Sequence, residues 1–205
     1  MEIQVFPDLK TLSRAAADIF ARLARKSAAM NNNRFTVALS GGSTPKSLYE
    51  RLASEDETYR DSVEWNKVNF FWSDERCVAP DISESNFKTA FDHLLRPLGI
   101  SPMNYHRLKG ELEPLVAAEE YERLLRLFFN LAENVVPQFD LMLLGMGVDG
   151  HTASLFPGSE ALTATKKIVA APFVKKFGAH RLTLTPDAIK NAANVVFLIA
   201  GADKA

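Results

Sequence analysis

Two residue types that could carry acid–base chemistry lie two positions apart in a glycine-rich segment. Residues 145–152 read GMGVDGHT, so only Gly150 separates Asp149 from His151. A carboxylate can orient an imidazole and stabilise its protonated form, and such a histidine can take a proton from water near neutral pH. The segment therefore predicts His151 as a general base with Asp149 as its partner. The same pattern would also fit a histidine in the turn that begins a helix.

A second cluster has the composition of an anion site. Residues 40–45 read SGGSTP. Gly41 and Gly42 would let backbone N–H groups approach an anion, Ser43 and Thr44 add hydroxyl donors, and a following helix would contribute its positive end. This pattern predicts a phosphate site, although a tight turn between a strand and a helix would look the same. It is neither a Walker A sequence nor GxGxxG.

Three consecutive charged residues, Asp74, Glu75 and Arg76, form a third cluster. A guanidinium matches the geometry of phosphate or carboxylate, and the neighbouring acids could hold it in place. The cluster is a candidate anion clamp. A solvated loop would show the same run of charges.

These clusters need a scaffold, and the hydrophobic pattern predicts one of alternating strands and helices. Apolar or β-branched runs predict strands at 3–6, 34–39, 68–72, 139–144, 181–185 and 195–200. Helical spacing predicts a helix after a capping Asp8, then helices at 46–53, 86–95, 114–132 and 186–192. Thr44 is the expected cap of the second helix, with Pro45 at its first position. The expected buried stripe of the long helix is Leu115, Tyr121, Leu124, Leu125 and Phe128.

Continuous apolar strands between helices predict an α/β fold, with a mostly parallel sheet covered on both faces. Ligands of such sheets bind beyond the carboxyl ends of the strands. Each polar cluster directly follows a predicted strand. We therefore expect the clusters to converge on one crevice.

Composition limits the classes of function. The chain has 205 residues, 47% hydrophobic and 24% charged, and a net charge of -1. These proportions predict one globular domain, or two small ones at most, without the positive field that attracts nucleic acid or anionic membrane. Cys77 is the only cysteine, which excludes an intramolecular disulfide and a cysteine-rich zinc site. The four histidines lack a metal-ligand spacing, and no GxSxG serine-hydrolase motif is present.

No apolar run approaches the roughly 20 residues that span a bilayer. The first residues, MEIQ, show no secretory signal pattern. We therefore expect a cytoplasmic protein that binds a small molecule, and a monomer is the default expectation.

The motifs together resemble those of the 6-phosphogluconolactonases. The matching segments are 40–45, 72–76, 85–86, 145–158, 181–185 and 201–205, in the order and approximate spacing of that family. The resemblance covers nearly the whole chain. It implies one domain over 1–205 with a Rossmann-like sheet, as in the related glucosamine-6-phosphate deaminases. It also implies hydrolysis of 6-phosphogluconolactone to 6-phosphogluconate in the oxidative pentose phosphate pathway, without metal or cofactor.

The same resemblance implies residue roles. His151 looks like the base that activates water, and Asp149 orients or tunes it. The substrate and its phosphate would be held by a larger set: Gly41, Gly42, Ser43, Thr44, Asp74, Arg76, Arg181 and Lys204. The chain stops one residue after Lys204, whereas family members normally continue for a few dozen residues, so we expect a C-terminal truncation.

Two alternatives stay open. A glucosamine-6-phosphate deaminase would share the fold and the DGH motif. In that family, however, the histidine is followed by a stretch of the form IAFNEP, where residues 152–157 of this chain read TASLFP. Phe156 cannot replace the glutamate of that motif, and Arg76 stands where deaminases usually have tyrosine. A sugar-phosphate sensor without catalytic activity would use the same phosphate loop. A damaged acid–base pair is expected of a sensor, yet Asp149 and His151 are both present.

Overall fold

A four-stranded parallel sheet forms the centre of the molecule. The computed structural model describes residues 2–30, 33–164 and 167–204. The strand order is β2 (Val68–Trp72), β1 (Phe35–Leu39), β4 (Leu141–Leu144) and β8 (Val195–Phe197). Leu39 is aligned with Trp72, so the segments that follow β1 and β2 leave the sheet at the same edge. The predicted parallel sheet is confirmed.

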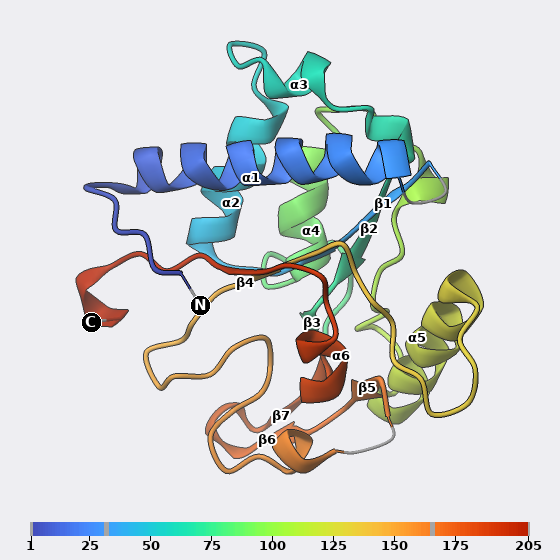
Figure 1. Ribbon diagram of the computed structural model, residues 1–205. Helices are drawn as coiled ribbons and strands as arrows, with labels where there is room; N and C mark the ends of the chain where they lie inside the picture. Colours follow the sequence, from blue (N-terminus) through green and yellow to red (C-terminus); the bar gives the residue numbers. More distant parts are fainter. Residues whose placement is uncertain (1, 31–32, 165–166, 205) are drawn as a thin grey trace.

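A second, antiparallel sheet continues from the first. Its strands are β3 (Asp74–Arg76), β7 (Ala179–Leu184), β5 (Val169–Ala170) and β6 (Phe173–Val174), and β7 pairs with the other three. Ser73 joins the two sheets, because its N–H donates to the Leu39 carbonyl (2.8 Å) and its carbonyl accepts from the Leu184 N–H (2.7 Å). In Figure 1, β5, β6 and β7 lie at the opposite end of the view from α1 (Leu9–Met30).

Helices cover both faces of the parallel sheet, as predicted. Side chains alternate between the faces along β2. Phe70 stacks on Trp65, which itself stacks on Phe20 of α1, whereas Phe71 contacts Phe128 and Phe129 of α5 (Pro114–Phe129). The core therefore has two apolar layers with the sheet between them.

The remaining helices are short or lie against α1. They are α2 (Ser43–Ala53), α3 (Tyr59–Ser62), α4 (Asn86–Ala90) and α6 (Pro186–Lys190). A π-helical turn, Phe91–Leu95, continues α4, so the helix predicted at 86–95 is present but changes its winding. Short 3-10 turns are Trp65–Lys67, Pro102–Asn104, Glu160–Thr163, Lys175–Phe177 and Ala202–Lys204.

Helix ends follow from local side-chain chemistry. The Asp8 carboxylate accepts a hydrogen bond from the Thr11 N–H (2.7 Å) at the start of α1, as its predicted capping role requires. The Glu113 carboxylate accepts from the Val116 N–H (2.9 Å) before α5. Asn130 ends that helix in the left-handed conformation that asparagine tolerates.

Three local predictions and one alternative are wrong. Residues 3–6 form no strand, since they pair with none of the described strands, and Ile3 and Val5 are 76% and 91% exposed. The second helix begins at Ser43 with Gly42 before it, so Thr44 is not the cap. Leu115, in the first turn of α5, is exposed and so does not belong to the buried stripe of this helix. The alternative of a solvated loop at 74–76 is wrong, because these residues form β3, which pairs with β7, and Asp74 and Glu75 are buried.

Candidate active site

The predicted clusters meet in one cavity of 310 Å³ beyond the carboxyl ends of β1 and β4. The lining includes nearly all of the predicted residues: Gly41, Gly42, Ser43, Thr44, Asp74, Arg76, His151, Arg181 and Lys204. Asp149 is the exception, and it is bonded to His151. The expected convergence is confirmed, while the roles of these residues stay predictions.

The Asp149 carboxylate fixes the ring of His151. Asp149 Oδ1 pairs with His151 Nδ1, and Asp149 Oδ2 pairs with Lys176 Nζ at 3.0 Å. The hydrogen bonds from His151 and then from Lys176 hold the pKa of Asp149 well below its usual range. The carboxylate is therefore ionised at neutral pH. With Nδ1 engaged, Nε2 is the nitrogen of His151 that remains for proton transfer.

The loop around His151 is shaped by its glycines. The Gly147 N–H donates to the His151 carbonyl (2.8 Å), and a Cβ on Gly147 would lie 2.1 Å from His151 Nδ1. Gly150 has a φ of 78°, which favours glycine. Residues 151–158 form no helix, so the alternative of a histidine at a helix start is wrong.

Aromatic rings form one wall of the cavity. The ring of Phe156 stacks on the imidazole of His151, with centroids 4.2 Å apart. Phe177 meets Phe156 edge to face at 5.8 Å and lies under the guanidinium of Arg181 at 4.9 Å. Sequence reasoning missed Phe177 and Lys176, because the 175–178 turn carries no motif and reaches the site only through the pairing of β6 with β7.

The glycine loop after β1 brings backbone close to the cavity. A Cβ on Gly41 would lie 1.8 Å from Asn86 Oδ1, so only glycine fits there. Gly42 has a φ of 108° and offers no side chain to cap α2, which leaves the first turn of this helix to interact with a ligand. The buried hydroxyl of Ser40, which also lines the cavity, has no hydrogen-bond partner among the described residues.

Asp74 is a buried acid at the cavity wall. Its carboxylate accepts hydrogen bonds from Ser154 Oγ (2.8 Å) and Asn86 Nδ2 (3.2 Å). Burial raises the pKa of Asp74, and the nearby Arg76 and His151 oppose this shift. Asp74 is thus held by neutral donors while it faces the same cavity as His151.

Glu75 points away from the cavity and supports it. Its carboxylate accepts from the N–H groups of Arg76 (2.7 Å), Asn86 (2.7 Å) and Phe87 (2.8 Å), and from the Ser85 hydroxyl (3.0 Å). These bonds attach β3 to the start of α4 and so place Asn86 against Gly41. The expectation that an acid beside Arg76 would support it agrees with the bond from the Arg76 N–H, whereas the bonds to the start of α4 were not predicted, because an acid in a charged triplet is ordinarily exposed.

Two arginines of the cavity wall come from opposite positions on β3 and β7. Arg76 and Arg181 are register partners. Burial, and then the positive charge of Arg76, lower the pKa of Arg181. Arg76 donates to the Glu84 carbonyl, and within the described residues neither arginine has an ion pair with a carboxylate. Lys204, in the last 3-10 turn, adds a third basic residue to the lining. The cavity is therefore suited to an anion.

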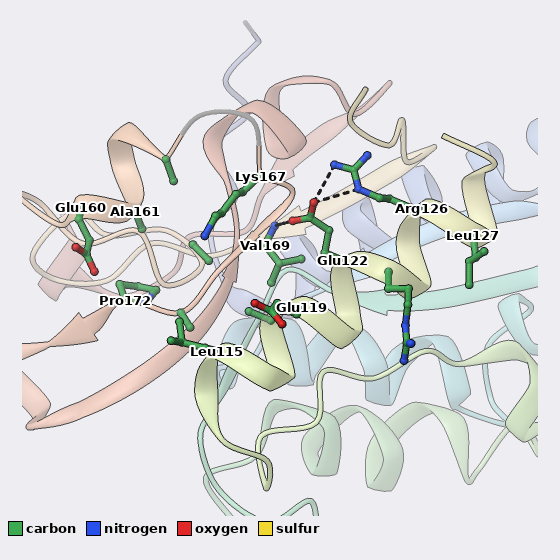
Figure 2. Close-up of a pocket in the computed structure, with 15 residues that line it drawn as sticks. Leu115, Glu119, Glu122, Arg126, Leu127, Glu160, Ala161, Lys167, Val169 and Pro172 are labelled. Atoms are coloured by element: carbon green, nitrogen blue, oxygen red, sulfur yellow. Dashed lines mark hydrogen bonds and ion pairs between the residues drawn. The ribbon is translucent and has the colours of Figure 1, made fainter. Parts of the chain in front are cut away.

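A larger cavity of 740 Å³ lies elsewhere, between α5 and residues 160–172, and Figure 2 shows its lining. Glu122 is its central acid. The Glu122 carboxylate is bonded to Arg126 (2.8 Å) and to the N–H groups of Ile168 (2.9 Å) and Val169 (3.3 Å). These contacts attach β5 to α5, which is a structural role. None of the predicted site residues lines this cavity.

Within residues 2–30, 33–164 and 167–204, no group of three or more His, Cys, Asp or Glu side chains could hold a metal ion. Nor does any helix in this described part have the length and apolar character needed to cross a membrane.

An open parallel sheet with a cavity beyond its carboxyl edge defines the class of α/β proteins whose ligand sites lie at that edge. The chain belongs more specifically to the family described as glucosamine-6-phosphate isomerases/6-phosphogluconolactonase, whose sequence model matches residues 7–205.

Several relatives in this family are similar over most of this chain. The 6-phosphogluconolactonase of Nostoc sp. is 40% identical over an alignment of 204 positions, which covers 98% of this chain and 81% of that protein. The 6-phosphogluconolactonase of Treponema pallidum is 33% identical and covers 100% of this chain and 81% of its own length. The solved structure of 6-phosphogluconolactonase from Trypanosoma brucei superposes with a TM-score of 0.85 at 32% identity, covering 98% of this chain and 82% of that one.

Proposed function

We propose that this protein hydrolyses 6-phosphogluconolactone to 6-phosphogluconate, with His151 as the general base. The pairing of His151 Nδ1 with an ionised Asp149, in a cavity that also holds Arg76 and Arg181, carries this proposal. The names of the relatives support the substrate.

The chemistry requires little more than a base and hydrogen-bond donors. His151 Nε2 accepts a proton from a water molecule, whose oxygen forms a bond to the lactone carbonyl carbon. The carbonyl π electrons move to its oxygen, and donors from the glycine-rich loops stabilise that charge. When the tetrahedral intermediate collapses, the bond between that carbon and the ring oxygen breaks. The ring oxygen takes the proton from His151, and the new carboxylic acid ionises.

Asp149 keeps the imidazole in the productive tautomer during this cycle. Its ionised carboxylate also stabilises the imidazolium that forms when water is deprotonated. No covalent nucleophile is needed, because a δ-lactone carbonyl is already electrophilic.

The basic wall would position the substrate. We assign its phosphate to Arg76, Arg181 and Lys204 together with the Gly41, Gly42, Ser43 and Thr44 loop at the start of α2. Binding energy at this remote group then holds the lactone carbonyl next to His151. The volume of 310 Å³ lies at the small end of the range for small-molecule sites, as a single phosphorylated sugar requires.

A deaminase is the competing function, and Phe156 argues against it. The aromatic ring of Phe156 stacks on His151, near the place where the deaminase motif would supply an acid. It offers no proton donor. The sensor alternative has no damaged site to support it, since Asp149 and His151 are in contact.

We further propose a cytoplasmic monomer that binds neither nucleic acid nor membrane. The single cysteine fits a reducing compartment, and the net charge of -1 provides no general attraction for polyanions. Size-exclusion chromatography with light scattering would show the oligomeric state directly.

The test is a coupled assay in which glucose 6-phosphate is oxidised to the lactone and formation of 6-phosphogluconate is followed. The rate with protein is compared with the spontaneous rate. We expect acceleration that is lost in His151→Ala and kept in His93→Ala, a matched control whose ring pairs with Glu50 (3.2 Å) and lies outside the cavity. A folded wild-type protein that leaves the spontaneous rate unchanged would refute the proposal, and glucosamine 6-phosphate would be the next substrate tested.

A further inference from the structure

The turn at 175–178 connects β6 to β7 and has a fixed shape. Phe173 pairs with His180 and Val174 with Ala179, so the two strands hold both ends of the turn. The Gly178 N–H donates to the Lys175 carbonyl (3.2 Å), and Gly178 has a φ of 59°. The side chains in this turn therefore start from a defined backbone.

Two side chains of the turn reach the candidate site in different places. Lys176 Nζ lies 3.0 Å from Asp149 Oδ2. Phe177 contacts the ring of Phe156 and the guanidinium of Arg181. The aromatic contacts hold the turn against the cavity wall, and Lys176 then has a short path to Asp149.

We propose that Lys176 is a positioning residue, which shares the Asp149 carboxylate with His151 and thereby favours the neutral, proton-accepting form of His151. The kinetic part of this inference rests on the proposed function. The protonation part does not, because it concerns three side chains whose contacts are described above.

The charges around His151 explain what a cation next to Asp149 would do to the protonation of His151. An unshared Asp149 carboxylate would stabilise the imidazolium and so delay formation of the free base until higher pH. Asp74 on β3 and Arg76 are the other charged groups near this pair, and His151 and Arg76 both oppose the rise that burial causes in the pKa of Asp74. Lys176, from the turn after β6, places a positive charge against the Asp149 carboxylate.

The size of the effect is limited by solvent. The Lys176 side chain is 55% exposed, and salt screens exposed charges. For the removal of one charge from a partly solvated site, we expect the His151 titration to move by about 0.5 pH unit at low salt. We expect most of that shift to disappear at about 1 M salt.

The experiment compares three variants of the full chain. Lys176→Met removes the charge and keeps much of the side-chain volume, and Lys176→Arg restores the charge. Lys175→Met is the matched control, because Lys175 is an exposed lysine of the same turn that makes no ion pair with the described residues. The His151 ring protons are titrated by NMR and assigned with a His151→Asn variant, and the pH profile of kcat/KM is measured in parallel.

We expect the His151 titration and the acid limb of kcat/KM to move to higher pH in Lys176→Met, to return in Lys176→Arg, and to stay within about 0.1 pH unit of wild type in Lys175→Met. Equal titration of His151 in Lys176→Met and Lys175→Met would overturn the inference. The NMR titration needs no turnover, so a wild-type protein without lactonase activity would defeat the proposed function and leave this result to stand separately.

Discussion

Gly147 lies so close to His151 that a Cβ at this position would be 2.1 Å from both Nδ1 and Cε1 of the imidazole. The same Cβ would be 2.8 Å from Asp149 Oδ1. No real Cβ tolerates such contacts, so one methyl group would move the ring, the carboxylate or both. The ring position therefore depends on the absence of a side chain two residues before Asp149.

We expect Gly147→Ala to lower kcat by about 100-fold, because a displacement of about 1 Å from the reactive geometry costs that much. The melting temperature should change little, since the change lies in an irregular loop outside the core. Val148→Ala is the control, as Val148 is exposed and does not line the cavity. Wild-type kinetics in Gly147→Ala would mean that the ring position is not critical.

Asp149→Asn tests the carboxylate directly. An amide cannot stabilise the imidazolium and permits the wrong tautomer, so we expect kcat to fall by about 100- to 10,000-fold. Because His151 and Lys176 hold the pKa of Asp149 well below its usual range, this group stays ionised at pH 5 to 8 in wild type. The fall of kcat/KM at acid pH should therefore have the slope expected for one protonation. A steeper fall, with the slope of two protonations, would show that Asp149 titrates together with His151.

Arg76→Ala and Arg181→Ala test the basic wall. Each variant should raise KM by about 10-fold or more and change kcat less, because a guanidinium bonded to phosphate holds the substrate before and during the reaction. The two guanidiniums repel each other in the empty site, so neither change should lower the melting temperature of the ligand-free protein. Titration of the product 6-phosphogluconate in a thermal-shift assay would measure binding without turnover. An unchanged KM in both variants would remove them from the site.

Glu75→Gln tests the support behind the cavity. Both Glu75 oxygens accept from donors, so an amide nitrogen would face donors on one side and lose their hydrogen bonds. We expect a loss of about 1–3 kcal/mol in the free energy of unfolding, measured in urea. Glu84→Gln, at an exposed acid nearby, should cost far less. Equal costs for the two changes would argue that the Glu75 contacts contribute little to stability.

The same carboxyl group gives stability a pH dependence. Burial raises the pKa of Glu75, so the folded state holds this proton more tightly than the unfolded chain. Its contribution is fully present below the unfolded pKa of about 4 and is lost as pH rises through the folded value. The unfolding free energy of the wild-type protein should therefore include a decline as pH rises through that window, and this decline should be absent in Glu75→Gln. An unchanged slope in urea titrations at several pH values would contradict the assignment.

Local patterns in the sequence were enough to predict the central sheet, its main helices and the Asp149–His151 pair. The apolar runs of β1, β2 and β4 and the spacing of α1 and α5 are periodic signals that a single sequence displays, and so the parallel sheet was predictable. Asp149, Gly150 and His151 are adjacent in the chain. Their pairing needs no distant contact, which is why the motif alone indicated it.

Tertiary structure decided what depends on contacts between distant segments. Residues 3–6 have the composition of a strand but no partner strand, and backbone hydrogen bonds require one. Glu75 is buried only because β3 meets the start of α4, and Lys176 reaches Asp149 only because β6 pairs with β7. A strand or a charge is visible in sequence. Its partner across the fold is not, because a spatial contact leaves no local periodicity.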